Sequence, residues 1–281
     1  MTHLVEAVYL NQRMSSNHHP VAVVDCRFSL NDPGAGRSAY EQGHVPGAVF
    51  ADLDLDLSGP VSEHGGRHPL PDIGQLTVTL GKLGIDRQTE VVAYDDQGGL
   101  FAARLWWLLK WLGHDRVAVL NGGYSAWLKA GFGVTADTPR PIPCQYTPAL
   151  QPDWEAVTAE QVRAKLGEPG LQLIDSRERQ RYLGFEEPID KVAGHIPGAL
   201  YYFWKDVLGP DGLWKSPEEL RQHFEALDAD REVIVYCGSG VSACPNVLAL
   251  HLAGFGKVKL YAGSWSDWIS YPEHPIAQGE A

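Results

Sequence analysis

An internal duplication is the feature that most constrains what this chain can fold into. VAVVDCRFSL recurs as LQLIDSRERQ, so that Asp25 corresponds to Asp175, and GHVPGAVF recurs as GHIPGALYYF. VVAYDDQGG recurs as VIVYCGSGV, and VAVLNGGYSAW recurs as VKLYAGSWSDW. Four blocks repeated in one order, with a period far longer than that of a solenoid, predict two similar domains.

The boundaries follow from the spacing of these blocks. We expect domain 1 at residues 1–137 and domain 2 at residues 154–281. Between them, residues 138–153 read TPRPIPCQYTPALQPD, a proline-rich segment typical of an extended linker. A length of 281 residues suits two domains of ordinary size.

Each domain alternates short β-branched runs with helical stretches. LQLI at 171–174 and VIVY at 233–236 lack the alternation of a half-exposed strand and therefore predict buried strands. Thr158 with Gln161 predicts a capping box, and Ser216 followed by Pro217 predicts the start of a helix over 216–227. The pattern predicts an α/β fold in which each domain has a mostly parallel sheet flanked by helices.

Charge and targeting signals exclude several classes of partner. Lys and Arg number 23 against 35 Asp and Glu, a net charge of −12, which argues against nucleic acid or an anionic membrane as the main partner. The first 20 residues do not resemble a secretory signal, and no apolar run approaches the length of a membrane span. Four cysteines are too few for a disulfide scaffold, so we expect a reducing, cytoplasmic location.

The candidate nucleophile is Cys237, which directly follows the VIVY strand. Parallel α/β sheets bind ligands beyond the carboxyl ends of their strands. The loop after the cysteine, ahead of a helical pattern, consists of Gly238, Ser239, Gly240, Val241 and Ser242. The glycines allow backbone N–H groups to converge on an anion, and the helix N-terminus adds positive potential. We therefore expect a lowered pKa at Cys237 and a reactive thiolate.

The remaining cysteines are expected to be structural. Cys26 follows a buried strand, Cys144 lies in the linker and Cys244 falls within a helix, although a regulatory disulfide between Cys237 and Cys244 remains an alternative. Asp95 occupies the position in domain 1 that matches Cys237. Because a carboxylate cannot perform thiol chemistry, we expect domain 1 to be catalytically silent.

Other prominent residues favour structural roles. We expect a buried ion pair in each domain, backbone hydrogen bonds from the histidines that precede the Pro-Gly turns, and a hydrophobic core containing the tryptophan pair. The residues concerned are Asp25 with Arg27, Asp175 with Arg177, His44, His195, Trp106 and Trp107.

The chain resembles the tandem rhodanese-type sulfurtransferases in a combination of motifs. These are the paired GHxPGA blocks, the YD loop, the CGSGVSA loop and the GGYSAW and AGSWSDW endings. The resemblance covers nearly the whole chain. It implies a double displacement in which Cys237 takes sulfur from a small anionic donor as a persulfide. The acceptor would be cyanide or a protein thiol such as a thioredoxin, and neither metal nor organic cofactor would be required.

The same resemblance bears on the donor. The loop is similar to the CGSGVTA loop of 3-mercaptopyruvate sulfurtransferases, with Ser242 in place of threonine, whereas animal thiosulfate sulfurtransferases carry CRKGVTA. The block DSRERQRYLG places the family's donor-carboxylate arginine at Arg181. The second arginine of the mercaptopyruvate enzymes falls on Asp190, beside Lys191, which leaves both donors open.

The resemblance further implies a serine relay. Ser239 lies two residues after the cysteine, VFADLDLD places the aspartate at Asp54 with Asp52 as the alternative, and GRHPLP places the histidine at His68.

A cysteine phosphatase and a persulfide carrier are the alternatives to an enzyme that transfers sulfur. A cysteine phosphatase needs an arginine six residues after its cysteine, and Ala243 stands there. A persulfide carrier that delivers sulfur between partners without turnover remains compatible with the sequence. Redox chemistry of the CxxC kind is excluded, because Gly240 occupies the fourth position.

Overall fold

The computed structural model describes residues 2–16 and 21–280, which form two compact units. Unit 1 contains Met1–Gly59, Pro71–Gln151 and Pro210–Trp214, and unit 2 contains Pro60–Leu70, Pro152–Gly209 and Lys215–Ala281. Each unit therefore includes a short segment from the sequence region of the other. Pro60–Leu70 places Arg67 and the candidate site residue His68 in unit 2.

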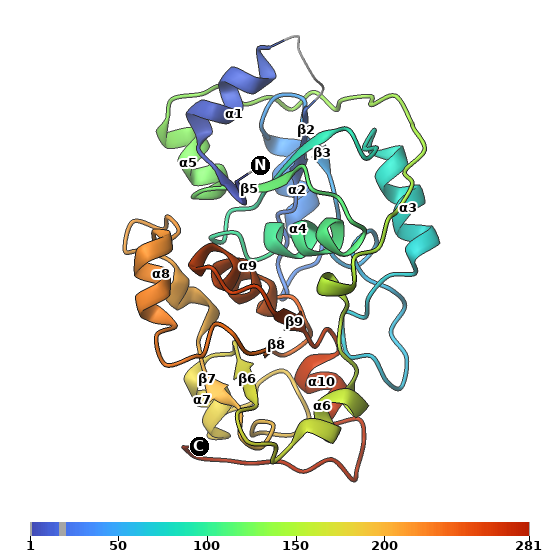
Figure 1. Ribbon diagram of the computed structural model, residues 1–281. Helices are drawn as coiled ribbons and strands as arrows, with labels where there is room; N and C mark the ends of the chain where they lie inside the picture. The colour runs from blue at the N-terminus through green and yellow to red at the C-terminus, as the bar shows by residue number, and fades with distance from the viewer. Residues whose placement is uncertain (1, 17–20, 281) are drawn as a thin grey trace. The chain divides into compact units, whose positions relative to one another are not determined.

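Unit 1 is built on a five-stranded parallel sheet in the order β1-β5-β4-β2-β3 (Figure 1). Its strands are β1 Leu4–Val5, β2 Val21–Asp25, β3 Val49–Phe50, β4 Glu90–Tyr94 and β5 Val117–Leu120. Its helices are α1 Ala7–Met14, α2 Ala35–Gln42, α3 Ile73–Lys82, α4 Ala102–Trp111 and α5 Gly123–Lys129.

Unit 2 repeats this plan with a four-stranded parallel sheet in the order β7-β6-β8-β9. Its strands are β6 Gln172–Asp175, β7 Leu200–Tyr201, β8 Val233–Tyr236 and β9 Val258–Leu260. Its α-helices are α6 Ala159–Lys165, α7 Arg179–Leu183, α8 Pro217–His223, α9 Ala243–Ala253 and α10 Ser264–Trp268. Two 3₁₀ helices, η1 Pro152–Trp154 and η2 Trp204–Val207, complete the unit. The predicted parallel α/β architecture is confirmed in both units.

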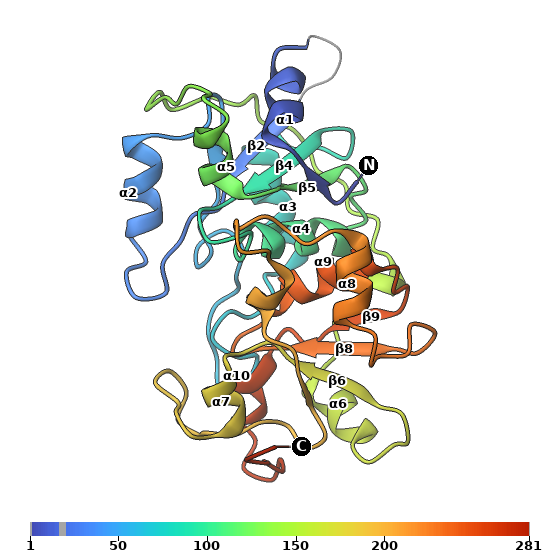
Figure 2. The same cartoon turned by 90° about the vertical axis from the view of Figure 1, so that its left-hand side faces the viewer.

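Alternate residues of the central strands pack against opposite layers, as the pleat of a strand requires. In β4, Val92 and Tyr94 join a buried cluster with residues of α1 and α5. Helix α4 also contacts β4 and β5, but its residues do not belong to that cluster. In unit 2, Ile234 and Tyr236 belong to a cluster with residues of α6, α7 and α10. Helices α8 and α9 lie on the other side of that sheet (Figures 1 and 2). Burial on both faces explains why these strands read as continuous apolar runs.

Local predictions are largely confirmed. Thr158 and Ser216 each form a capping box, and Pro217 occupies the first turn of α8. That helix ends at His223 rather than continuing to 227, because the chain tightens into a turn in which the Leu227 N–H donates to the Phe224 carbonyl at 2.9 Å. Trp106 and Trp107 are fully buried in α4, as expected.

The expected ion pairs and histidine contacts are also confirmed. Within each unit an arginine bonds an aspartate two residues earlier at 2.6 Å, and a histidine Nδ1 lies within 2.8 Å of a carbonyl oxygen. The pairs are Arg27–Asp25, Arg177–Asp175, His44–Tyr40 and His195–Tyr182. Among residues 2–16 and 21–280, no helix is long and apolar enough to cross a membrane.

Candidate active site

Cys237 follows β8 directly, at the carboxyl edge of the unit 2 sheet. From β6 the chain continues to β7 on one side, whereas β8 and β9 lie on the other side, so the strand order reverses between β6 and β8. A reversal of strand order opens a crevice in which α/β proteins bind ligands. Cys237 is 1% exposed, so its sulfur lies below the surface.

The loop after Cys237 curls back so that an amide faces the sulfur. The Gly240 N–H donates to Cys237 Sγ at 3.2 Å. Gly240 has φ +78°, and a β-carbon at this position would collide with the carbonyl oxygen of Ala262. Only glycine satisfies both conditions, so the second glycine of CGSG is required for the amide to reach the sulfur. Ser242 occupies the N-cap position of α9, which begins at Ala243, but its side chain makes no capping hydrogen bond.

Ser264 braces the loop from the start of α10. Its Oγ accepts the Cys237 N–H at 3.0 Å, lies 2.9 Å from the carbonyl oxygen of Tyr261 and lies 3.9 Å from Cys237 Sγ. With φ +57° it is the one non-glycine residue of positive φ in the described part of the chain. Gly123, the matching residue of unit 1, has φ +56°. A strained serine where the twin module has glycine indicates a functional constraint.

The matching loop of unit 1 holds an anion in the same kind of cradle. Asp95 follows β4 as Cys237 follows β8, and its buried carboxyl group accepts hydrogen bonds from backbone N–H groups within 2.9 Å. The donors are Gln97, Gly99, Phe101 and Ala102. Burial raises the pKa of Asp95, and these amides oppose that rise. The strand–loop–helix turn of this fold is therefore suited to an anion, and unit 2 places a sulfur there.

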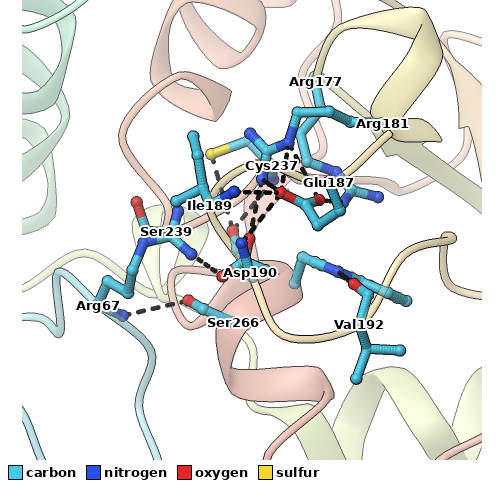
Figure 3. Close-up of polar contacts among 12 residues, drawn as sticks. Arg67, Arg177, Arg181, Glu187, Ile189, Asp190, Val192, Cys237, Ser239 and Ser266 are labelled. Atoms are coloured by element: carbon cyan, nitrogen blue, oxygen red, sulfur yellow. Dashed lines mark hydrogen bonds and ion pairs between the residues drawn. The ribbon is translucent and has the colours of Figure 1, made fainter. Parts of the chain in front are cut away.

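An arginine cluster flanks the loop in unit 2 (Figure 3). Arg181 donates through Nε to both oxygens of Glu187, at 2.9 and 3.0 Å, and through Nη2 to Asp190 Oδ2 at 2.8 Å. Arg177 also bonds Glu187, at 3.2 Å. The candidate donor-binding residue Arg181 is thus already held by two carboxylates, one of them Asp190, the position at which the sequence departs from the mercaptopyruvate pattern.

Arg67 joins this cluster and was missed by the sequence reasoning. Its guanidinium pairs with Asp190 Oδ1, and its backbone N–H donates to Ser266 Oγ at 3.1 Å. A β-carbon on Gly238 would lie 2.9 Å from Arg67 Nη2. Burial lowers the pKa of Arg67, as does repulsion from Arg181, whereas the charge of Cys237 acts in the opposite direction. The only sequence signal was adjacency to His68 in GRHPLP.

His68 and Ser239 are brought together in unit 2. His68 Nδ1 lies 2.7 Å from Ser239 Oγ, and both side chains are buried. Asp52 and Asp54 lie in unit 1. The Asp52 carboxylate accepts hydrogen bonds from the N–H groups of Asp54 and Leu55 and so stabilises the turn that it begins. Burial, with repulsion from Asp52, raises the pKa of Asp54.

The other cysteines lack this environment. Burial raises the pKa of Cys26 well above its usual value and also raises that of Cys144. Cys244 lies in the first turn of α9, with Sγ 3.3 Å from the carbonyl oxygen of Gly240. All four cysteines are free thiols in the structure.

A duplicated parallel α/β fold that places a cysteine at a strand end, with one loop amide on its sulfur and arginines beside the loop, defines the structural class of this protein. Comparison with known proteins specifies that class. The rhodanese-like domain family matches residues 6–130 and 158–271, one match in each half of the chain. This chain belongs to the rhodanese-like family.

The curated relatives that match nearly the whole chain are named as sulfurtransferases. It is 48% identical to a probable 3-mercaptopyruvate sulfurtransferase of Pseudomonas aeruginosa, covering 99% of this chain and 98% of that protein. It is 39% identical to the thiosulfate sulfurtransferase of Mus musculus, covering 92% of this chain and 89% of that protein. The 3-mercaptopyruvate sulfurtransferase structure from Leishmania major superimposes with a TM-score of 0.82 at 30% identity, over 94% of this chain and 73% of that one. The chain is a sulfurtransferase.

Proposed function

We propose that Cys237 is the sulfur carrier of a double displacement and that 3-mercaptopyruvate is the preferred donor. The observation that carries this proposal is the Gly240 N–H directed at Cys237 Sγ, at the carboxyl end of β8. An oriented amide stabilises negative charge on sulfur, both in the attacking thiolate and in the persulfide formed from it. Unit 1, with Asp95 in the matching position, takes no sulfur.

The first half-reaction forms the persulfide. The Cys237 thiolate attacks the donor sulfur, the bond between that sulfur and C3 of mercaptopyruvate breaks, and its electron pair remains on C3. The proton of the donor thiol is transferred to C3, which yields pyruvate and the Cys237 persulfide anion. With thiosulfate, the S–S bond breaks and sulfite leaves with the electron pair, so no proton has to move.

The proton transfer gives Ser239 and His68 a role. Their 2.7 Å contact forms a pair that can accept the donor thiol proton and return it to C3. The family resemblance gives Asp54 as the aspartate of this relay, with Asp52, whose carboxylate accepts two backbone N–H groups, as the alternative. This relay serves mercaptopyruvate and is dispensable for thiosulfate.

The loop composition favours the mercaptopyruvate donor. Residues 238–242 themselves contain no cationic side chain, unlike the CRKGVTA loop of the animal thiosulfate sulfurtransferases. Arg181 is the candidate to bind the donor carboxylate, since it lies beside Gly238 with Nη2 3.4 Å from the position of a β-carbon there.

The second half-reaction returns the enzyme to its thiolate. An acceptor thiolate, from a small thiol or a thioredoxin-like protein, attacks the outer sulfur of the persulfide, and cyanide would attack in the same way to give thiocyanate. Four free thiols support a reducing compartment, and we propose the cytoplasm.

Mass spectrometry of the donor-treated protein tests the carrier. We expect one added sulfur on Cys237, no addition in Cys237→Ser, and normal loading in the matched control Cys244→Ser. An unmodified Cys237, or full turnover by Cys237→Ser, would refute the mechanism. Steady-state rates with both donors side by side then separate an enzyme from a persulfide carrier, because a carrier would load once without sustained release of pyruvate or sulfite.

A further inference from the structure

Asp190 is a buried carboxylate between two arginines beside the loop that follows Cys237. Asp190 Oδ1 pairs with Arg67 and Oδ2 with Arg181, as Figure 3 shows. The carboxyl side chain is 3% exposed, whereas that of Arg67 is 31% exposed. The position of Asp190 is set by the turn before it, because Glu187 Oε1 accepts the N–H groups of Ile189 and Asp190 at 3.1 and 3.0 Å.

Arg67 reaches the loop from a segment remote in sequence. The segment is anchored to α10, since the Gly65 N–H donates to Asp267 Oδ1 at 2.7 Å and the Arg67 N–H donates to Ser266 Oγ at 3.1 Å. The guanidinium consequently lies close to Gly238, the first residue after the sulfur carrier, on which Arg181 also converges. Two guanidinium groups beside one glycine form a bidentate-capable site for a planar anion such as a carboxylate.

The charges of this cluster are balanced as the protein stands. Three arginines, Arg67, Arg177 and Arg181, are paired with three carboxylates, Asp175, Glu187 and Asp190. Asp190 is the one carboxylate that bonds both arginines nearest Gly238. It therefore competes with an incoming anion for the same donors and removes one unit of positive charge from the site.

We propose that Arg67 is a second donor-binding residue beside Arg181, and that Asp190 is a positioning residue that holds the two guanidinium groups and selects the charge of the donor. A monoanionic carboxylate shares the arginines with Asp190. A dianion meets the full repulsion of the Asp190 carboxylate and is disfavoured. The proposal rests on the sulfur transfer at Cys237 described above and adds to it how the donor is recognised.

The kinetic test compares three donors: 3-mercaptopyruvate, its uncharged amide and thiosulfate. Arg67→Ala should lower kcat/KM for mercaptopyruvate about ten- to a hundredfold, mainly through KM, as expected for loss of one charge-assisted hydrogen bond. In Arg67→Ala, kcat/KM for the amide should change less than about twofold. Arg67→Lys should restore part of the kcat/KM that Arg67→Ala loses with mercaptopyruvate. Arg179→Ala is the matched control, because Arg179 lies on the same helix as Arg181, α7, but pairs with the exposed Glu280.

Asp190→Asn tests the positioning role. It keeps the size of the side chain and removes the charge, so the ratio of kcat/KM for thiosulfate to that for mercaptopyruvate should rise at least about threefold. Equal losses of Arg67→Ala activity with the amide and with mercaptopyruvate would overturn the role of Arg67. An unchanged donor ratio in Asp190→Asn would overturn that of Asp190.

A binding measurement separates this inference from the proposed function. Calorimetric titration of pyruvate and of sulfite into Cys237→Ser protein needs no turnover. Arg67→Ala in that background should weaken pyruvate binding about tenfold or more, and Asp190→Asn should strengthen sulfite binding. If binding depends on Arg67 but the parent protein does not load sulfur, the proposed sulfur transfer is refuted and this inference stands. If the parent protein loads sulfur but binding is unaffected by the Arg67 and Asp190 substitutions, this inference is refuted and the sulfur transfer stands.

Discussion

Replacing Ser264 by alanine and by glycine separates two free-energy contributions that meet at one residue. Its hydroxyl serves the Cys237 N–H and the carbonyl oxygen of Tyr261, and its backbone has φ +57°. A non-glycine residue in this conformation costs about 1–2 kcal/mol. Each buried backbone group left without its partner costs about 1–3 kcal/mol.

Alanine usually makes a protein more stable than glycine at the same position. At position 264 we expect the reverse, with the glycine variant more stable than the alanine variant. Ser264→Ala loses both hydrogen bonds and keeps the strain, so it should be destabilised by about 2–6 kcal/mol. Ser264→Gly loses the same bonds but gains about 1–2 kcal/mol from relief of strain. About 0.5–1 kcal/mol of that gain is offset by the greater freedom of glycine in the unfolded chain. Ser264→Gly should thus be the more stable variant by roughly 1 kcal/mol.

Urea unfolding midpoints of the two variants provide the measurement, with hydrogen exchange of the Cys237 and Trp265 amides as a local readout. Gly131→Ala calibrates the backbone cost alone, because Gly131 has φ +77° and a β-carbon there meets no atom within 4 Å. Both Ser264 variants should load sulfur on Cys237 more slowly than the parent, since neither holds the loop through its hydroxyl. An alanine variant as stable as the glycine variant would refute the assignment of strain.

Two further predictions concern unit 1. Asp95→Asn should destabilise the protein by about 2–4 kcal/mol, because an amide NH₂ would face N–H donors that now bind a carboxylate oxygen, and thermal unfolding checks this; an unchanged midpoint would contradict the anion cradle. Burial, with the charge of Lys110, lowers the pKa of His3 to about 4, so the folded state keeps His3 neutral and its contribution to stability is lost as the pH falls from about 6.5 to 4. The stability advantage of the parent over His3→Asn should shrink across that interval in urea titrations, and a constant difference would contradict it.

Much of the fold was predictable because its signals are local or repeated. The strands after which Asp95 and Cys237 stand are apolar on both faces, and that pattern is independent of what packs on them. The capping boxes at Thr158 and Ser216 involve residues three apart, so the sequence alone indicates them. The end of α8 was placed too late, because the helical periodicity continues while the backbone tightens at Phe224.

The sequence by itself determined the duplication and the parallel α/β class, and it singled out Cys237 and the glycine turn that directs an amide at its sulfur. Each of these depends on neighbours within a few residues or on comparison of one half of the chain with the other. Only the tertiary structure decided that Pro60–Leu70 joins unit 2, and that Arg67 and Arg181 share Asp190. Arg181 and Asp190 are nine residues apart, but Arg67 is 123 residues from Asp190, and at that separation spacing along the chain carries no information about distance in space.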